Sequence, residues 1–202
     1  MIFENIFLKI IQPLVDILAG IPSVVYGVWG VLSVVPFVSK VVAPVFHVHT
    51  SGYSILSGAL VLGVMIIPYI LNILIEIFRS VPEDLIEASL ALGTTRWETI
   101  KTVLLRKTFS GIISSFVLGI SRAFGETIAV LMVVGNTIII PHSVFDAGYP
   151  LPALIANNYG EMLSIPMYDS ALMFSALILF LIVLLFNYGA RSVIRKYKPS
   201  GM

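Results

Sequence analysis

The chain has 202 residues, of which 58% are hydrophobic and 11% are charged, and its mean hydropathy is +1.01. Soluble domains carry about 25% charged residues, so this composition excludes an ordinary soluble domain and predicts an integral membrane protein. The formal net charge of +1 says little about partners, because the distribution of charge matters more than its sum. The absence of cysteine excludes a disulfide framework, thiolate catalysis and cysteine-ligated metals.

The amino-terminal residues 1–16 predict a short amphipathic segment that is broken at Pro13. They contain neither a basic region at the start nor a small-residue cleavage site after their apolar part. We therefore expect no removable signal peptide.

Four apolar segments are long enough to cross about 30 Å of hydrocarbon, which takes roughly 20 residues each. In the first of them, Pro22 and the neighbouring glycines and prolines predict a kinked or closely packed helix. The sequence therefore predicts an all-α integral membrane protein with a single transmembrane domain over residues 1–202, whose spans cover about 17–37, 53–75, 108–137 and 170–190.

Basic residues indicate which loops face the cytoplasm. The segment 76–107 contains five Lys and Arg residues and the carboxyl-terminal tail contains four more, whereas residues 138–169 contain none. We therefore expect both termini and the segment 76–107 to be cytoplasmic, and residues 138–169 to form an external loop.

The segment 76–107 holds ten charged residues and is too rich in helix formers to be a slack linker. Ser80 and Thr95 each have a glutamate three residues later, which is the spacing of a capping box and predicts two helix starts. Gly93 is predicted to separate the two short helices. Such a pair suits docking into the groove of a separate motor protein; a helical hairpin that packs only on its own membrane domain is the alternative.

Two charged residues lie within the third predicted span. Arg122 follows Lys107 by 15 residues, which is roughly 22 Å along a helix, so its charge lies deep in the membrane. Such a charge costs from about 2.5 kcal/mol upward and usually faces a cavity or a partner. Glu126 is four residues further along, which predicts an ion pair on one helix face. Arg122 is expected to contact a tetrahedral oxyanion in transit while Glu126 positions it; a structural salt bridge is the alternative.

The sequence contains no motif for nucleotide binding or hydrolysis. Phosphate-binding Gly-x4-Gly-Lys-Ser/Thr, His-Glu-x-x-His and Gly-x-Ser-x-Gly patterns are all absent, and no nucleophile–base pair is in reach by spacing, which argues against an intramembrane enzyme. His47 and His49 have metal-like spacing without a third ligand nearby, which favours a wetted interfacial loop over a metal site.

The docking segment contains a longer pattern: Glu87-Ala88-Ser89, then Gly93 after three residues, then Val103-x-Leu105 after nine more. This pattern resembles the EAA loop of type I ABC importer permeases, in which the loop forms a coupling helix seated in a cleft of the ATP-binding subunit. The resemblance implies a MetI-like permease fold. It implicates the following residues in coupling to an ATPase: Glu87, Ala88, Ser89, Gly93, Thr95, Val103 and Leu105. The family pattern has alanine where this chain has Ser89 and proline where it has Arg106.

Motifs elsewhere resemble the phosphate permeases of the PstC type. They are Ile21-Pro22-Ser23-Val24-Val25-Tyr26-Gly27-x-Trp29-Gly30, Met65-Ile66-Ile67-Pro68-Tyr69, Arg122-Ala123-x-Gly125-Glu126-Thr127-x-Ala129-Val130, Gly135-Asn136-Thr137 and Ala153-Leu154-Ile155-Ala156-Asn157. The companion PstA type is similar but departs after Gly-Glu-Thr. The resemblance implies phosphate as the cargo and implicates Arg122, Glu126 and the adjoining Thr127 in its passage. It also implies a location in the bacterial or archaeal cytoplasmic (inner) membrane.

The same resemblance implies the other subunits of a transporter. These are a PstA-like second permease, PstB-like ATP-binding subunits that hold ATP and Mg, and a periplasmic PstS-like phosphate-binding protein. This chain itself is then expected to be no enzyme, to bind no cofactor or metal and to contact membrane lipid but no nucleic acid. PstC-type permeases are longer, and this chain corresponds to their last four spans, with the first two absent. Either the start is misassigned, or the chain is a fragment, or another chain supplies the missing helices.

Two other functions stay open beside phosphate import. One is a permease of the same kind for another oxyanion, such as sulfate or molybdate, because tetrahedral oxyanions use similar hydrogen-bond donors. The other is a membrane subunit that does not transport and instead signals phosphate status or holds an assembly together.

Overall fold

The protein is helical throughout the part that the computed structural model describes, which is residues 6–160 and 167–197, with side chains for residues 12–160 and 167–189. Within these ranges the only β-type pairing is an isolated bridge between Gly135 and Gly148. The predicted all-α fold is therefore confirmed. The elements are α1 (Ile6–Gly20), α2 (Ser23–Trp29), the π-helical η1 (Gly30–Val34), α3 (Val35–Phe37), the π-helical η2 (Val38–Val42), α4 (Ala43–Val45), α5 (Ile55–Arg79), α6 (Glu83–Ala91), α7 (Arg96–Thr99), the π-helical η3 (Ile100–Leu104), α8 (Leu105–Phe124), α9 (Ile128–Val133), α10 (Leu151–Asn158) and α11 (Tyr168–Tyr197).

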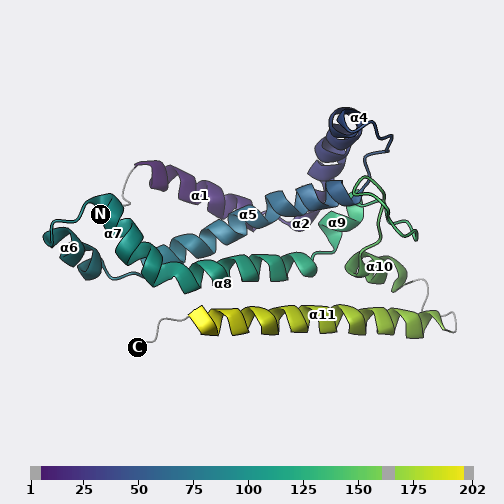
Figure 1. Ribbon diagram of the computed structural model, residues 1–202. Helices are drawn as coiled ribbons and strands as arrows, with labels where there is room; N and C mark the ends of the chain where they lie inside the picture. Colours follow the sequence, from purple (N-terminus) through teal and green to yellow (C-terminus); the bar gives the residue numbers. More distant parts are fainter. Residues whose placement is uncertain (1–5, 161–166, 198–202) are drawn as a thin grey trace.

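The long helices lie side by side along one axis of the molecule (Figure 1), with α8 packed between α5 and α11. Helices α6 and α7 lie at one end of this axis, and α4 lies at the other. Within the described residues, four helical stretches are long and apolar enough to cross a membrane: Ser23–Val45, Ile55–Arg79, Arg96–Phe124 and Tyr168–Gly189. The long axis is therefore the direction in which the chain would cross a bilayer.

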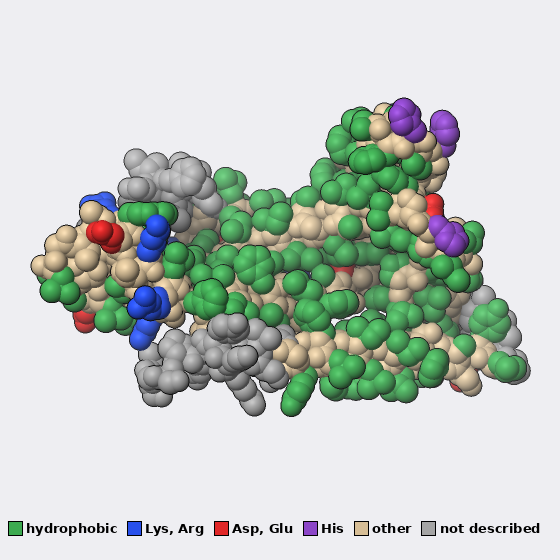
Figure 2. Space-filling model, viewed as in Figure 1, with side chains coloured by type: hydrophobic (Ala, Val, Ile, Leu, Met, Phe, Trp, Pro, Cys, Tyr) green, Lys and Arg blue, Asp and Glu red, His purple; other side chains and the backbone are tan. Residues whose placement is uncertain are grey.

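The surface along the long helices is apolar, whereas Lys and Arg gather at the end that carries α6 and α7 (Figure 2). On α11, the side chains of Phe174 and Leu185 are 63% and 67% exposed. Exposing so continuous an apolar surface is unfavourable in water but not in the hydrocarbon of a membrane. The composition and the surface together are those of an integral membrane protein.

The first spanning stretch differs from its predicted bounds. Helix α1 continues through Pro13, where a break was expected, and the spanning stretch begins at Ser23 rather than near residue 17. Pro22 explains the later start, because its extended backbone (ψ 142°) caps α2 and separates it from α1. The prediction of a break at Pro13 was wrong because α1 packs along α5, and this packing offsets the backbone hydrogen bond that proline removes.

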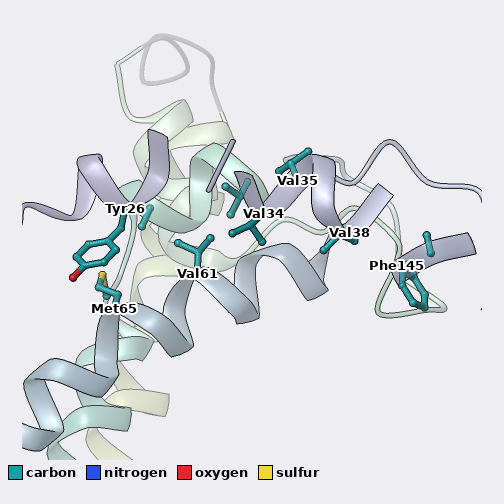
Figure 3. Close-up of a cluster of buried hydrophobic side chains, with 10 residues drawn as sticks. Tyr26, Val34, Val35, Val38, Val61, Met65 and Phe145 are labelled. Atoms are coloured by element: carbon teal, nitrogen blue, oxygen red, sulfur yellow. The ribbon is translucent and has the colours of Figure 1, made fainter. Parts of the chain in front are cut away.

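The core lies where the α2–α4 stretch, α5 and α9 meet (Figure 3). At Gly30 the helices approach so closely that an added Cβ would lie 2.7 Å from Val61 and 2.8 Å from Val133. Helices in a membrane associate through such close packing, because the lipid removes the hydrophobic driving force. The predicted close packing of the first span is thus confirmed.

The third spanning stretch is shifted towards the amino terminus. It begins at Arg96, since α7, η3 and α8 form one continuous helix, and it ends at Phe124 instead of extending to residue 137. The Gly125 and Glu126 N–H groups bond to carbonyls three residues earlier, at 3.1 and 3.2 Å, which closes the last turn of α8. Residues 125–127 therefore separate α8 from the short α9, and a single helix over 108–137 was wrong.

The segment predicted as an external loop is partly ordered by the helices beneath it. Residues 143–148 cover the start of α5, where the Ile55 and Leu56 N–H groups donate to the Asp146 and Val144 carbonyls at 3.0 and 2.8 Å. Helix α10 then lies between this loop and α11, while residues 161–166 of the segment fall outside the described part. The fourth span, expected at 170–190, lies within α11.

Candidate functional site

Helices α6 and α7 form a short hairpin at the charged end of the molecule (Figures 1 and 2). Between them, Gly93 has φ +84°, a backbone conformation that costs little only for glycine. The Leu92 and Gly93 N–H groups close the end of α6 on the Ser89 and Leu90 carbonyls. The sequence prediction that Gly93 ends the first helix is therefore confirmed.

The start of α7 is the capping box that the sequence predicts. The Thr95 N–H donates to the Glu98 carboxylate at 2.8 Å, and the Glu98 N–H donates to the Thr95 hydroxyl at 3.3 Å. The corresponding prediction for Ser80 was wrong, since Pro82 caps α6 and the Ser80 hydroxyl instead donates to the Ile77 carbonyl at 2.7 Å. Ser80 is unavailable as an N-cap because α5 continues to Arg79 and uses Ser80 as its own C-cap.

Three hydroxyl groups, which we call the hydroxyl cluster (Ser89, Thr94 and Thr99), join the two helices of the hairpin. The Ser89–Thr94 and Thr94–Thr99 oxygens are each 2.9 Å apart, and the Ser89–Thr99 oxygens are 3.1 Å apart. Ser89 and Thr99 are buried. The cluster fixes α6 against α7 by polar contacts, because the hairpin is too short to build an apolar core of its own.

The residues predicted to couple to an ATPase lie at different depths in this hairpin. Glu87 and Ala88 are on the exposed face of α6, and Thr95 is exposed at the start of α7, whereas Ser89 is buried in the hydroxyl cluster. Val103 and Leu105 lie further along the continuous helix, in η3 and at the first position of α8. The structure thus brings Glu87, Ala88, Ser89, Gly93 and Thr95 together and places the other two beside them on the helix that leads into the membrane.

Two large apolar side chains project from the hairpin and were not predicted as docking residues. Leu92 is 85% exposed, and Trp97 is 63% exposed with the Lys101 ammonium 5.1 Å from its ring centroid. A tryptophan inside a charged segment is the sequence signal that could have identified this surface, because exposed aromatic side chains are typical of protein interfaces.

Arg122 lies in the last turn of α8, next to the break between α8 and α9. Its guanidinium carbon is 4.6 Å from the centroid of the Tyr69 ring on α5, and the side chain is exposed. The predicted ion pair with Glu126 is absent from the described part of the chain. The reason is that the helix ends at Phe124, so Glu126 does not stand four residues further along the same helix face.

Glu126 and Thr127 form the break itself. Both are half-buried, and the Thr127 hydroxyl donates to the Gly125 carbonyl at 3.3 Å. Non-helical backbone at membrane depth is tolerated only where protein buries it or where it lines a water-filled cavity. Arg122, Glu126 and Thr127 thus lie in one short segment at this break. The geometry by itself assigns no ligand to them.

The continuous helix from Arg96 to Phe124 connects the two candidate regions. Thr99 of the hydroxyl cluster is near its start, and Arg122 is in its last turn. At 1.5 Å per residue the distance between these residues along the helix is roughly 35 Å. The hairpin and the neighbourhood of Arg122 are therefore joined by one continuous helix.

The three histidines lie at the end opposite the hairpin (Figure 2). A cavity of about 550 Å³ there is lined by His47 and His49, and a second of about 410 Å³ by His49, His142 and Asp146. Within the described residues, no group of three or more His, Cys, Asp or Glu side chains is placed to share a metal ion. His47 and His49 are both exposed, as expected for a wetted loop.

Comparison with known proteins identifies the class of this chain. Residues 2–198 match the family described as "Binding-protein-dependent transport system inner membrane component". This match covers nearly the whole sequence, so the chain belongs to that family of transport permeases. The identification of the sequence as an importer permease is therefore confirmed.

The more specific relatives are permeases too. The chain is 41% identical over 184 residues to the probable ABC transporter permease protein YqgH of Bacillus subtilis, covering 89% of this chain and 58% of the relative. It is 37% identical over 182 residues to the phosphate transport system permease protein PstC of Xylella fastidiosa, covering 83% and 56%. To the probable PstC of Methanocaldococcus jannaschii it is 36% identical over 183 residues, covering 85% and 58%. The chain therefore spans somewhat more than half the length of these relatives.

The fold has a solved counterpart in the MetNI methionine ABC transporter. One of its chains in an inward-facing conformation superposes on this chain with a TM-score of 0.69, covering 98% of this chain and 78% of that one, at 21% identity. The predicted MetI-like permease fold is therefore confirmed. At this identity the likeness concerns the fold and carries no information about the cargo.

Proposed function

We propose that this chain is the transmembrane permease subunit of an ATP-driven importer of inorganic phosphate. The single observation that supports this most strongly is Arg122 at the break between α8 and α9, which is exposed and, within the described residues, held by no carboxylate. Guanidinium groups bind tetrahedral oxyanions through a planar set of N–H donors. The similarity to PstC proteins supports phosphate among such anions.

The charged hairpin end is proposed to be cytoplasmic, with both termini on the same side. ATP-binding subunits of the PstB kind would dock on Glu87, Ala88 and the exposed Leu92 and Trp97, and these subunits would hold ATP and Mg. A PstA-like permease would complete the pathway, and a PstS-like protein would deliver phosphate from the periplasm. This chain then has no catalytic activity and needs no cofactor.

The continuous Arg96–Phe124 helix gives this proposal a mechanical route. Closure of the ATP-binding subunits would push on α6, and the hydroxyl cluster would transmit the push to α7 and so to α8. The pathway near Arg122 would turn towards the periplasm, and ATP hydrolysis would return it to the cytoplasm. Glu126 and Thr127 would line the same segment and moderate the affinity, since a site that holds its cargo too tightly does not release it.

The proposal is tested with the complete transporter reconstituted in proteoliposomes. Arg122→Gln keeps a polar side chain and removes the charge, so we expect phosphate uptake to fall at least tenfold. Normal uptake by this variant, together with altered phosphate-dependent signalling in cells, would instead indicate a subunit that does not transport. Inhibition of uptake by excess sulfate or molybdate would indicate another oxyanion as the cargo.

Coupling is tested separately with Glu87→Lys, which reverses a charge on the exposed face of α6. We expect phosphate-stimulated ATP hydrolysis to be lost while the basal hydrolysis of the isolated ATP-binding subunits is unchanged. Lys107→Glu, which reverses an exposed charge outside the hairpin, is the control. Unchanged stimulation in Glu87→Lys would exclude coupling through this face.

A further inference from the structure

Within the described residues, Arg122 contacts an aromatic ring and no acidic side chain. Its guanidinium carbon lies 4.6 Å from the ring centroid of Tyr69. In the part of the chain described here, neither a hydrogen bond nor an ion pair connects Arg122 to another side chain. Arginine is the cation most often found over aromatic faces, where the ring quadrupole attracts it.

The packing of α5 on α8 fixes the position of this ring. Gly119, one turn before Arg122, approaches α5 so closely that an added Cβ would lie 2.5 Å from Ile70 and 3.2 Å from Ile66. Ile66 and Ile70 are four residues apart on one face of α5, and Tyr69 lies at the edge of that face, three residues after Ile66; Gly119 and Arg122, also three residues apart, share one face of α8. Tyr69 is half-buried in this contact. The close approach of the two helices at Gly119 therefore brings the Tyr69 ring within reach of the Arg122 guanidinium.

This kind of contact preserves the chemistry that an anion needs. The π face accepts no conventional hydrogen bond from the guanidinium, so its five N–H donors stay available. A carboxylate partner would neutralise the charge and occupy two of those donors in a bidentate pair. An arginine supported by a ring thus binds an oxyanion more strongly than one paired with an acid.

We infer that Tyr69 is a positioning residue of the anion pathway, whose ring holds the Arg122 guanidinium in the orientation that meets a tetrahedral oxyanion. The inference rests on the proposed function, because it says which residue supports Arg122, the side chain proposed to contact the phosphate. The phenol hydroxyl has no part in it. Among the described residues that hydroxyl makes no hydrogen bond, so ring and hydroxyl can be tested apart.

The first test is phosphate uptake by the complete transporter in proteoliposomes, with Tyr69→Phe and Tyr69→Leu compared with wild type. Tyr69→Phe keeps the ring and is expected to stay within about twofold of the wild-type Vmax. Tyr69→Leu removes the ring and is expected to lower Vmax roughly fivefold, the effect of losing one cation–π contact. The KM should not change, because the phosphate-binding protein sets it. Normal Vmax in Tyr69→Leu, or equal losses in both variants, would overturn the inference.

A second measurement separates positioning from packing and does not require transport. Thermal unfolding of the same complex is compared for Tyr69→Leu in the Arg122 and Arg122→Gln backgrounds. If the ring acts through the guanidinium, Tyr69→Leu lowers Tm clearly less when Arg122 is already replaced. Additive losses would contradict the inference and assign Tyr69 to packing alone.

The failure of this inference differs from the failure of the proposed function. If Arg122→Gln stops uptake and Tyr69→Leu does not lower it, the proposed function stands and the role of Tyr69 is wrong. If Arg122→Gln transports phosphate normally, the proposed role of Arg122 is wrong, and the inference fails with it.

Discussion

Gly119 lies in α8 where this helix packs on Ile66 and Ile70 of α5. An added Cβ would be 2.5 Å from the Cγ1 atom of Ile70, so Gly119→Ala forces the two helices apart or displaces Ile70. We expect a loss of about 1–3 kcal/mol in unfolding free energy, as for other overpacked sites. Thermal unfolding in detergent measures this loss of stability.

Gly63→Ala is the matched control for this substitution. Gly63 is also a helical glycine, in α5, and has no atom within 4 Å of an added Cβ. Alanine is favoured over glycine in a helix interior by up to about 1 kcal/mol, so this variant should unfold at or above the wild-type temperature. Similar Tm losses in the two variants would show that the close contact at Gly119 is unimportant.

The arginine site shows which residue contacts can be predicted from sequence. Arg122 was recognised as a charge within an apolar stretch, and the structure places it in the last turn of the helix that contains this stretch. Its partner could not be predicted, because the i, i+4 rule requires the helix to continue past Phe124, and it does not. Tyr69 is distant in sequence and reaches Arg122 only through the packing at Gly119.

At the scale of elements, the hydroxyl cluster determines how firmly α6 is joined to α7. Thr99→Val keeps the shape of a buried side chain but leaves Ser89 and Thr94 each without one oxygen partner at 3.1 and 2.9 Å. Ser89 and Thr94 still bond to each other, so the variant loses two hydrogen bonds, worth about 0.5–1.5 kcal/mol each, and we expect the hairpin to open locally. Faster limited proteolysis between residues 91 and 96 and weaker phosphate-stimulated ATP hydrolysis would report this.

The control for that variant is Thr102→Val, three residues further along the same helix. The Thr102 side chain is exposed, and its hydroxyl bonds only to the Glu98 carbonyl of its own helix, at 2.7 Å. Proteolysis and ATP hydrolysis should therefore stay at wild-type levels. If Thr99→Val behaves like Thr102→Val, the cluster does not join the two helices.

The end of a helix could be predicted where the residues that cap it are close together in the sequence. Thr95 and Glu98 satisfy each other within four residues, so the capping box follows from spacing alone. Ser80 has the same spacing and fails, because the preceding helix α5 uses that residue for its own end. The break predicted at Pro13 was wrong because packing against α5 keeps α1 helical there. Such packing leaves no local pattern in the sequence.

At the scale of the whole molecule, the number of spanning stretches and the helical fold follow from the length of the apolar runs. Their bounds do not, because a hydropathy pattern continues across Gly125 whereas the helix stops there. The hairpin and the histidines lie at opposite ends of the molecule (Figure 2), as expected when consecutive spans cross in alternating directions.

The orientation of this elongated molecule can be tested directly, because the chain contains no cysteine and a single introduced thiol is therefore unambiguous. Asp84→Cys places one on the exposed face of α6, and His142→Cys places one in the exposed loop at the opposite end. Basic residues favour the cytoplasmic side, and they gather around the hairpin. A maleimide that does not cross membranes should thus label His142→Cys in intact spheroplasts and Asp84→Cys only in inverted vesicles. The reverse pattern would place the hairpin outside, out of reach of any ATP-binding subunit, and coupling through α6 would then be impossible.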